Sequence, residues 1–368
     1  MRCWIEVSRG RLAANFEAIC QLVGPRVDVC PVVKADAYGH GAVEVSRVLA
    51  AAGARWLAVS SVDEGLALRH AGLETRILVM ADLPASDAVR HHLTLAIHDI
   101  ASLPELARLS AAAGVRIPYH LKIDSGMGRL GTRATAAEVA RAAAIHAPAL
   151  ELEGLMTHFA SAANYDTGQT EAQLARFAEV LAALPARPRY VHTSATVPVA
   201  YARRDAWCDM IRPGHAIYGY ISPIVRGAAP PRELNVKPAL TWKARLLTVK
   251  DIAAGEPIGY GAMHRAAAPM RIGIVAAGYA DGIPHRLGNK GSVIAGGRIV
   301  PMVGAVSMDV STIDLTGVAQ AAPGDTVTLL GEEDGASIDA QQIARLAGTI
   351  SYSVLCGISA RVAHVYVD

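Results

Sequence analysis

The sequence lacks any long apolar run, although its overall composition is hydrophobic. Apolar residues make up 52% of the 368 positions and charged residues only 18%. No segment of about 18 uninterrupted apolar residues occurs, so we expect no membrane-spanning helix. The first ten residues, MRCWIEVSRG, also lack the apolar core of a signal peptide. These absences predict a cytoplasmic protein, and the apolar content predicts a large buried core.

An excess of charge of either sign is also absent, because 35 Lys and Arg residues and 33 Asp and Glu residues leave a net charge of +2. This balance gives no electrostatic reason to expect binding to nucleic acid or to an anionic membrane. The 13 histidines show no paired ligand spacing, so we expect no metal site. The five cysteines form no C-x-x-C pair and are expected to be reduced thiols, most of them buried.

What the sequence does contain is a repeated alternation of short apolar, β-branched runs with alanine-rich helical stretches between about residues 28 and 220. Near-continuous apolar strands that alternate with helices are typical of a parallel sheet covered on both faces. Eight such units in about 200 residues favour an N-terminal (β/α)8 TIM-type barrel over residues 9–232 rather than an open sheet. The expected strands are 29–34, 56–61, 77–80, 93–98, 116–124, 150–158, 189–194 and 210–219.

The pattern changes after a stretch that contains proline and glycine, residues 225–240. The chain then becomes rich in strands broken by Gly, Pro and Asp turns, which predicts a mainly β C-terminal domain over residues 233–368. One helix is expected within it, from the segment SIDAQQIARLAGT, with Ser337 as its N-cap. Residues 1–8 read as a strand that joins this domain.

Ionisable and hydroxyl side chains follow several of the expected barrel strands. Because active sites of such barrels form at the carboxyl ends of the strands, these side chains should share one rim. A lysine among other cations at that rim can form an imine with a carbonyl cofactor. Lysine is scarce, with six in the chain, and spacing alone leaves open whether Lys34 does this or simply reaches solvent. The rim residues are Lys34, Lys122, Asp124, Arg129, His158, Ser194, Arg212 and Gly214.

Six segments of the chain resemble the alanine racemases: VVKADAYGHG, HLKIDSGMGRLG, MIRPGHAIYG, IGYG, GYADG and VSMD. They occur in the family's order, and the resemblance extends from IEVSRGRLAANF near the start to ISYSVLCGISARVAHVY at the end. The family consists of pyridoxal-phosphate-dependent isomerases with a barrel followed by a β domain. The resemblance therefore implies interconversion of L-alanine and D-alanine, with D-alanine biosynthesis as the associated role. The sequence leaves a catabolic role open.

The resemblance also assigns roles to individual residues. Lys34 is implied to carry pyridoxal 5'-phosphate and to act as one of two catalytic bases. Tyr260 is implied as the opposed base, supplied by the partner subunit of a homodimer with shared active sites. The residues implied to bind the cofactor are Lys34, Tyr38, Arg129, His158, Ser194, Arg212, Gly214 and Tyr352. The residues implied to bind the substrate are Arg129, Tyr279, Met308 and Asp309.

Two of these implied roles have a clear electrostatic reason. Arg212 would face the ring nitrogen of the cofactor, and because an arginine is always charged it would leave that nitrogen unprotonated. A weaker electron sink of this kind limits transamination and other side reactions. Lys122 is implied to be carbamylated, because an unmodified Lys122 would repel Arg129 whereas a carbamate would position it. His158 is implied to link Tyr260 to Arg212.

Five positions depart from the family's usual residues. An asparagine is common at Thr193, an aliphatic residue at His215, arginines at His285 and Ala305, and a glutamate at Ser353. A racemase of broader specificity, acting on serine for example, therefore remains an alternative on the same scaffold. A non-catalytic pyridoxal-phosphate-binding protein is a further alternative, but such proteins resemble the barrel alone. Amino-acid decarboxylases share both domains but place an acidic group at the ring nitrogen.

Overall fold

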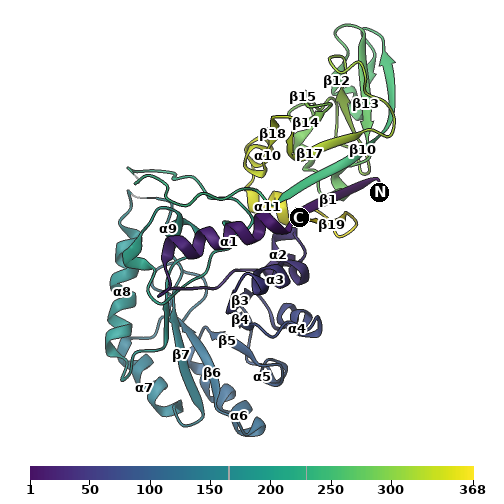
Figure 1. The fold of residues 1–368 in the computed structure, drawn as a ribbon. Helices are drawn as coiled ribbons and strands as arrows, with labels where there is room; N and C mark the ends of the chain where they lie inside the picture. Colours follow the sequence, from purple (N-terminus) through teal and green to yellow (C-terminus); the bar gives the residue numbers. More distant parts are fainter. Residues whose placement is uncertain (165, 229) are drawn as a thin grey trace. The chain divides into compact units, whose positions relative to one another are not determined.

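The computed structural model describes residues 1–164, 166–228 and 230–368, and the chain divides into two compact units. We call the first the barrel unit; it comprises Leu12–Ala37 and Ala42–Lys237. We call the second the β unit; it comprises Met1–Arg11, Tyr38–Gly41 and Pro238–Asp368. The assignment of residues 38–41 to the β unit has no counterpart in the sequence pattern. Figure 1 shows the elements of each unit.

The barrel unit contains eight parallel strands. Six of them form one sheet in the order β3-β4-β5-β6-β7-β8, and β2 pairs with β9. Backbone hydrogen bonds join the two sets, from Ala58 N–H to the Pro31 carbonyl at 2.8 Å and from Arg212 N–H to the Ser194 carbonyl at 2.9 Å. The expected barrel is confirmed. Its strands are β2 (Asp28–Val29), β3 (Trp56–Val59), β4 (Arg76–Val79), β5 (Leu93–Ile97), β6 (Ile117–Lys122), β7 (Leu150–Met156), β8 (Tyr190–His192) and β9 (Met210–Ile211).

Helices lie on the outside of these strands (Figure 1). Their boundaries follow local chemistry: Thr135 and Glu138 form a capping box at the start of α7, and α6 ends at Gly114, whose φ of 65° suits a left-handed cap. The inward faces are apolar, as with Phe177 and Val180 of α8. The helices are α1 (Arg9–Val23), α2 (Lys34–Gly39), α3 (Ala42–Ala51), α4 (Val62–His70), α5 (Ser86–Arg90), α6 (Leu103–Ala113), α7 (Ala136–His146), α8 (Gln169–Ala183) and α9 (Thr196–Ala200).

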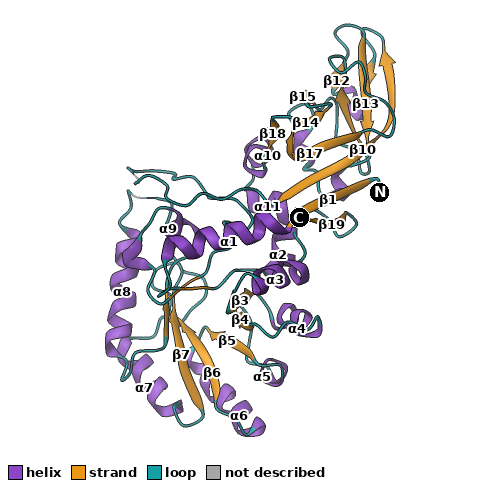
Figure 2. Cartoon of the chain, viewed as in Figure 1, coloured by secondary structure: helices purple, strands orange, loops and turns teal. Residues whose placement is uncertain are grey.

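Strands dominate the β unit, as Figure 2 shows. Its main sheet has the order β15-β14-β17-β10-β1-β19, and β13, β16 and β18 extend it. Strand β1 (Cys3–Ser8) pairs antiparallel with β10 (Leu240–Ile252) and parallel with β19 (Ala363–Val367). The mainly β second region is confirmed. Its other strands are β11 (Pro257–Ile258), β12 (His264–Arg265), β13 (Met270–Val275), β14 (Ser292–Ala295), β15 (Arg298–Pro301), β16 (Ser311–Asp314), β17 (Thr326–Glu333) and β18 (Ala336–Ile338).

The helices of the β unit are α10 (Ala340–Ala347) and α11 (Ser351–Cys356). The expected cap of α10 is wrong by two residues, because Ser337 belongs to β18 and pairs with Glu332 of β17. Asp339 is the N-cap instead: its side chain accepts from Gln342 N–H at 2.7 Å, and the Gln342 side chain accepts from Asp339 N–H at 2.8 Å. Because Ser337 is paired within the sheet, the helix begins later, and the next polar residue, Asp339, caps it.

A search of the described parts of the chain finds no helix with both the length and the apolar character needed to cross a membrane.

Candidate active site

The structure brings five of the predicted site residues into one electrostatic cluster in the barrel unit. Lys122 is the last residue of β6, and His158 and Arg212 follow the ends of β7 and β9. Lys34 and Arg129 act on both Lys122 and His158 through their charges. Parallel strands direct their carboxyl ends to a common rim, and this geometry explains why residues from distant parts of the sequence meet here.

The cluster is strongly positive. Burial, and then the charges of Arg212, Arg129 and Lys34, lower the pKa of Lys122 to about 8. Burial and the same cations lower the pKa of His158 to about 3, so its imidazole is neutral at neutral pH. This rim is therefore prepared for an anionic ligand.

Asp124 adds a negative charge near this cluster, but its carboxylate is engaged with the backbone. Asp124 Oδ1 accepts hydrogen bonds from the N–H groups of Gly126, Met127 and Gly128 at 3.2, 2.9 and 2.9 Å. These bonds fix the loop that leads to Arg129. Asp124 thus organises the loop, while its charge only partly offsets the surrounding cations.

Arg212 is 2% exposed, and burial lowers its pKa to about 10. Its Nη1 donates to His192 Nδ1 at 2.6 Å and to the His192 carbonyl at 3.0 Å. Its Nη2 donates to the Thr157 carbonyl at 2.6 Å and to the Thr193 carbonyl at 3.4 Å. These partners are neutral, so they orient the guanidinium without neutralising it. His192, which lies two residues before Ser194, was not among the residues predicted from the sequence.

Backbone amides converge near the eighth strand of the barrel unit. The Thr196 hydroxyl accepts from the N–H groups of Gly214 and Ala216, each at 3.3 Å. Thr193 and Ser194 donate their hydroxyls to the Ala206 carbonyl at 2.5 and 2.6 Å. The N–H groups of Gly214 and Ala216 thus point at one oxygen atom, that of the Thr196 hydroxyl. Thr196 was not identified from the sequence.

Helix α2, directly after Lys34, is a single left-handed turn. Ala35, Asp36, Ala37 and Tyr38 have φ values of 52°, 51°, 54° and 55°. This conformation costs roughly 1–2 kcal/mol per residue for L-amino acids, so other contacts must hold it. The Glu64 carboxylate provides one of them: Oε1 accepts from Ala35 N–H at 2.7 Å, while Oε2 accepts from Ser60 N–H at 2.6 Å and so fixes the carboxylate.

Tyr38 and Tyr352 lie together in the β unit. Their ring centroids are 5.9 Å apart, and burial raises the pKa of the Tyr38 hydroxyl. Gly39 permits a close backbone approach here, because a Cβ at this position would lie 2.5 Å from the Leu355 carbonyl oxygen. Two residues implied to bind the cofactor are thus brought together within this unit.

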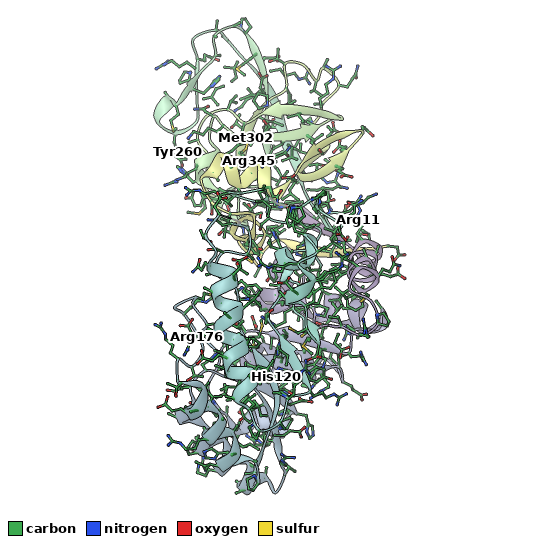
Figure 3. All side chains as sticks on the ribbon, turned by 90° about the vertical axis from the view of Figure 1, so that its left-hand side faces the viewer. Arg11, His120, Arg176, Tyr260, Met302 and Arg345 are labelled. Carbon is green, nitrogen blue, oxygen red and sulfur yellow. The ribbon has the colours of Figure 1, made fainter. Side chains whose placement is uncertain are left out.

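The remaining predicted residues lie on the surface of the β unit. Tyr260 is 76% exposed, Met308 54% and Tyr279 44%, and Figure 3 shows Tyr260 at the periphery of this unit. Tyr279 N–H donates to the Ser307 carbonyl at 3.0 Å, which places the segments of Tyr279 and Met308 side by side. Gly278 is required at this junction, because a Cβ there would lie 2.3 Å from the Ser307 carbonyl oxygen.

A buried carboxylate anchors these surface residues. Asp281 is 2% exposed; it accepts from Arg361 Nε at 2.7 Å, from Arg2 Nη2 at 3.1 Å and from Gly278 N–H at 2.8 Å. Arg361 also donates to Asp309 Oδ1 at 2.7 Å. Asp309 is therefore tied to the same network that fixes the Tyr279 turn.

Two of the residues that depart from the family's usual pattern lie beside these positions. The ring centroids of His285 and Tyr279 are 6.0 Å apart in an edge-on arrangement. A Cβ at Gly259, the residue before Tyr260, would lie 3.6 Å from the Ala305 amide nitrogen. Both departures thus fall next to predicted catalytic or substrate-binding residues.

Within residues 1–164, 166–228 and 230–368, no group of three or more His, Cys, Asp or Glu side chains is arranged to hold a metal ion.

Comparison with known proteins gives a consistent result over nearly the whole chain. Residues 7–223 match the model of the alanine racemase N-terminal domain, and residues 239–366 match that of the alanine racemase C-terminal domain. The alanine racemase of Syntrophobacter fumaroxidans is 37% identical over 360 residues, covering 96% of this chain and 95% of the relative.

Solved structures agree. The alanine racemase of Streptomyces lavendulae superposes with a TM-score of 0.92 at 32% identity, covering 100% of this chain and 97% of the other. The alanine racemase of Bartonella henselae, described with covalently bound pyridoxal phosphate, superposes with a TM-score of 0.89 at 25% identity, covering 100% of both chains.

Proposed function

The chain belongs to the alanine racemase family and interconverts L-alanine and D-alanine, and we propose that it does so with Lys34 and Tyr260 as opposed bases around pyridoxal 5'-phosphate. The observation that carries the proposal is the setting of Arg212, a buried cation held only by neutral groups. Such a residue suits a ring nitrogen that stays unprotonated.

The residues present suit this cofactor. The cations Lys34, Lys122, Arg129 and Arg212 provide charge for its anionic groups. The N–H groups of Gly214 and Ala216 converge on the Thr196 hydroxyl oxygen, and a phosphate oxygen would take the place of that hydroxyl as their acceptor. When bound, the cofactor withdraws electrons from the substrate's α-carbon and so makes the α-proton acidic.

Lys34 Nζ would hold the cofactor covalently, Arg212 would donate to its ring nitrogen, and Arg129 would contact its ring oxygen. Arg212 is a donor that keeps its own proton, so it neither protonates the ring nor exchanges protons with the substrate. The groups proposed to hold the phosphate are Tyr38, Ser194, Gly214 and Tyr352.

Racemisation requires that the α-proton leave one face of the substrate and return on the other. Lys34 Nζ would exchange this proton on one face, and Tyr260 Oη on the opposite face. His158, neutral because burial and the nearby cations lower its pKa to about 3, can both donate and accept. It would therefore link Tyr260 to Arg212 by hydrogen bonds. Tyr279, Met308 and Asp309 would bound the substrate.

The opposed base would be the partner subunit's Tyr260. The exposure of Tyr260 (76%), Met263 (57%) and Met308 (54%) supports this, because large apolar side chains grouped on one unit suit a covering surface. Mixing subunits tests the assignment. Lys34→Ala and Tyr260→Phe subunits, each inactive alone, should recover about a quarter of the activity after random exchange into mixed dimers. No recovery despite proven exchange would contradict shared sites.

Lys122 is proposed to carry a carbamate. Its pKa of about 8 leaves a neutral fraction whose Nζ can attack carbon dioxide, releasing one proton. The resulting negative charge would lie among Arg212, Arg129 and Lys34 and would position Arg129. Electron density for a bare ammonium group at Lys122 would contradict this assignment.

A racemase of broader specificity is the second candidate. Ala305 favours it, because a small side chain beside the Tyr260 segment leaves more room than an arginine would. His285, packed edge-on to Tyr279, places a flat aromatic ring where an arginine is common in the family. These two positions affect substrate choice, not the proposed bases.

One assay separates these functions. The purified protein is incubated with L-alanine, L-serine and larger L-amino acids, and formation of each D-isomer is followed. D-alanine as the fastest product supports a preference for alanine, and comparable rates for serine support the broader alternative. Bound cofactor with no D-isomer from any substrate would indicate a non-catalytic pyridoxal-phosphate-binding protein.

A further inference from the structure

A line of buried hydrogen-bonding side chains crosses the interior of the barrel unit behind Arg212. Arg212 Nη1 lies 2.6 Å from His192 Nδ1, and His192 Nε2 lies 2.9 Å from His120 Nδ1. His120 Nε2 lies 3.8 Å from Glu153 Oε2, and Glu153 accepts two bonds from Arg76 at 2.9 and 2.6 Å. We call these five residues the interior chain. It connects the carboxyl end of β9 with Arg76 at the start of β4.

The interior chain is buried from Arg212 to Glu153, and only its last member, Arg76, reaches solvent, with a side chain 38% exposed. His120 and His192 are 0% exposed and Glu153 is 5% exposed, and Figure 3 shows His120 among the strands of the barrel unit. The indole of Trp56 stacks against Arg76, whose Cζ lies 3.8 Å from the ring centroid. Gly154 makes room for His120, because a Cβ there would lie 2.5 Å from the imidazole. In such surroundings hydrogen bonds are strong and their direction matters.

The chemistry of Arg212 fixes the direction of the two histidine hydrogen bonds, whereas the contact between His120 and Glu153, at 3.8 Å, is electrostatic. An arginine can only donate, so His192 Nδ1 must accept from Arg212. Burial lowers the pKa of both His120 and His192, so each ring is neutral and carries one proton. That proton must lie on His192 Nε2, which donates to His120 Nδ1. The proton of His120 is then on Nε2 and faces Glu153.

An ionised Glu153 favours the same order, because its negative charge lies 3.8 Å from His120 Nε2 and attracts the ring N–H on that side. Burial would raise the pKa of Glu153, but the nearby His120 ring and the two hydrogen bonds from Arg76 outweigh it and bring the pKa to about 2. If the proton of His120 moved to Nδ1, His192 Nδ1 would become a donor facing the Arg212 donor. Glu153 therefore disfavours the arrangement that would push Arg212 out of place.

The order also determines which donor of Arg212 faces a ligand. In the described residues, Nη1 and Nη2 contact His192, Thr157 and Thr193. The Nε–H is the donor that these contacts leave for the proposed ring nitrogen, and the proposed bond to His158 would compete with the longest of them, from Nη2 to the Thr193 carbonyl at 3.4 Å.

We propose that Glu153, acting through His120 and His192 and held by Arg76, is a positioning residue that fixes the Nε2–H form of both histidines and keeps Arg212 Nε–H directed at the cofactor site. The meaning given to Arg212 rests on the proposed function. The proton positions do not, because they follow from the contacts alone.

Nuclear magnetic resonance of the full-length protein tests the proton positions directly. Ring 15N shifts distinguish N–H from bare nitrogen, and the signals are assigned with His120→Asn and His192→Asn variants. We expect bare Nδ1 and protonated Nε2 for both histidines, with and without added pyridoxal phosphate. A protonated Nδ1 on His192 in the unsubstituted protein would overturn the inference, whether or not any variant folds.

Glu153→Gln and its neighbour Glu151→Gln provide a matched pair, because both glutamates lie on β7 but Glu151 is exposed. Glu153→Gln should mix the two proton forms of His120 and His192 and lower kcat about 10-fold or more with little change in KM, as loss of a supporting hydrogen bond typically does. Glu151→Gln should change neither. Unaltered 15N shifts in a folded Glu153→Gln protein would overturn the role of Glu153.

The NMR and activity measurements test the interior chain and the proposed function independently. Racemase activity with a protonated His192 Nδ1 would refute the interior chain and leave the proposed function intact. The expected proton forms without racemase activity would refute the proposed function and leave the interior chain intact.

Discussion

The proposed site residues of the barrel unit are buried and held by many contacts, whereas those of the β unit are exposed. Arg212 and Lys122 are 2% and 6% exposed, but Tyr260 and Met308 are 76% and 54% exposed. The barrel unit can therefore set the charge and orientation of its groups by itself. The β unit fixes its backbone through Asp281 and presents side chains that remain accessible. This difference agrees with the proposal above, in which the barrel unit supplies a preorganised half of the site and the partner subunit supplies the other half.

The strongest test of the preorganised half is Lys34→Ala. It removes the proposed covalent attachment and one base, so we expect loss of the cofactor's visible absorbance and a fall in activity of roughly 10⁴-fold or more. Lys290→Ala, at an exposed lysine in the β unit, should alter neither. Retained absorbance together with normal turnover would show that Lys34 has another role.

The exposed half is tested by Tyr260→Phe. The substitution removes one hydroxyl from an exposed ring, so folding and cofactor absorbance should be unchanged. The L-to-D rate should fall by roughly 10²-fold or more, which is the usual size of general-base catalysis. A fall in rate that merely follows a fall in bound cofactor would contradict the assignment of Tyr260 as a base.

Asp281→Asn tests whether the β unit depends on its buried anchor. The change weakens hydrogen bonds from Arg361 and Arg2, whose side chains are 41% and 49% exposed. We expect a loss of roughly 1–3 kcal/mol in the free energy of unfolding, measured by denaturant titration. Asp251→Asn, at an exposed position of β10, is the control and should cost little. Equal effects would show that Asp281 is not an anchor.

Acid should weaken both units through two different carboxylates. Burial would raise the pKa of Asp281, but hydrogen bonds from Arg361 and Gly278 N–H outweigh it, so its pKa falls below the usual 3.8. The pKa of Glu153 falls from 4.5 to about 2. Both groups bind protons more readily when unfolded, so their stabilisation is present above pH about 4.5 and is lost as pH falls further. Glu153→Gln and Asp281→Asn should each flatten the fall in unfolding free energy between pH 4.5 and 2.

The smallest expected effect concerns substrate choice. Ala305→Arg should narrow the space beside the Tyr260 segment and lower kcat/KM for L-serine relative to L-alanine by about 3–10-fold, typical of a single pocket contact. Gln320→Arg adds the same charge at an exposed position of the β unit and should leave the ratio unchanged. An unchanged ratio in Ala305→Arg would exclude this position from specificity.

Periodicity and motif order predicted the barrel, the β region and the rim cations. The interior chain could not be predicted from the sequence, because nothing there distinguishes His120 and His192 from ordinary core residues. The fold alone places His120 Nδ1 2.9 Å from His192 Nε2. The left-handed turn after Lys34 was also missed, since Ala35, Asp36 and Ala37 have no sequence signal for positive φ. Glu64, from a distant helix, helps to hold that turn.

The sequence by itself determined which residue types are available and where strands and helices alternate, because apolar periodicity and turn residues act locally. It also carried the motifs that give Lys34, Arg212 and Tyr260 their proposed roles. Only the tertiary structure decided the protonation of the buried rim residues Lys122 and His158. Burial and neighbouring charges, which arise when distant strands meet at one rim, bring Lys122 to a pKa of about 8 and His158 to about 3. Which nitrogen of His120 and of His192 carries the proton likewise depends on the residues at both ends of the interior chain. Only folding brings those end residues, Arg212 and Glu153, close to the two histidines.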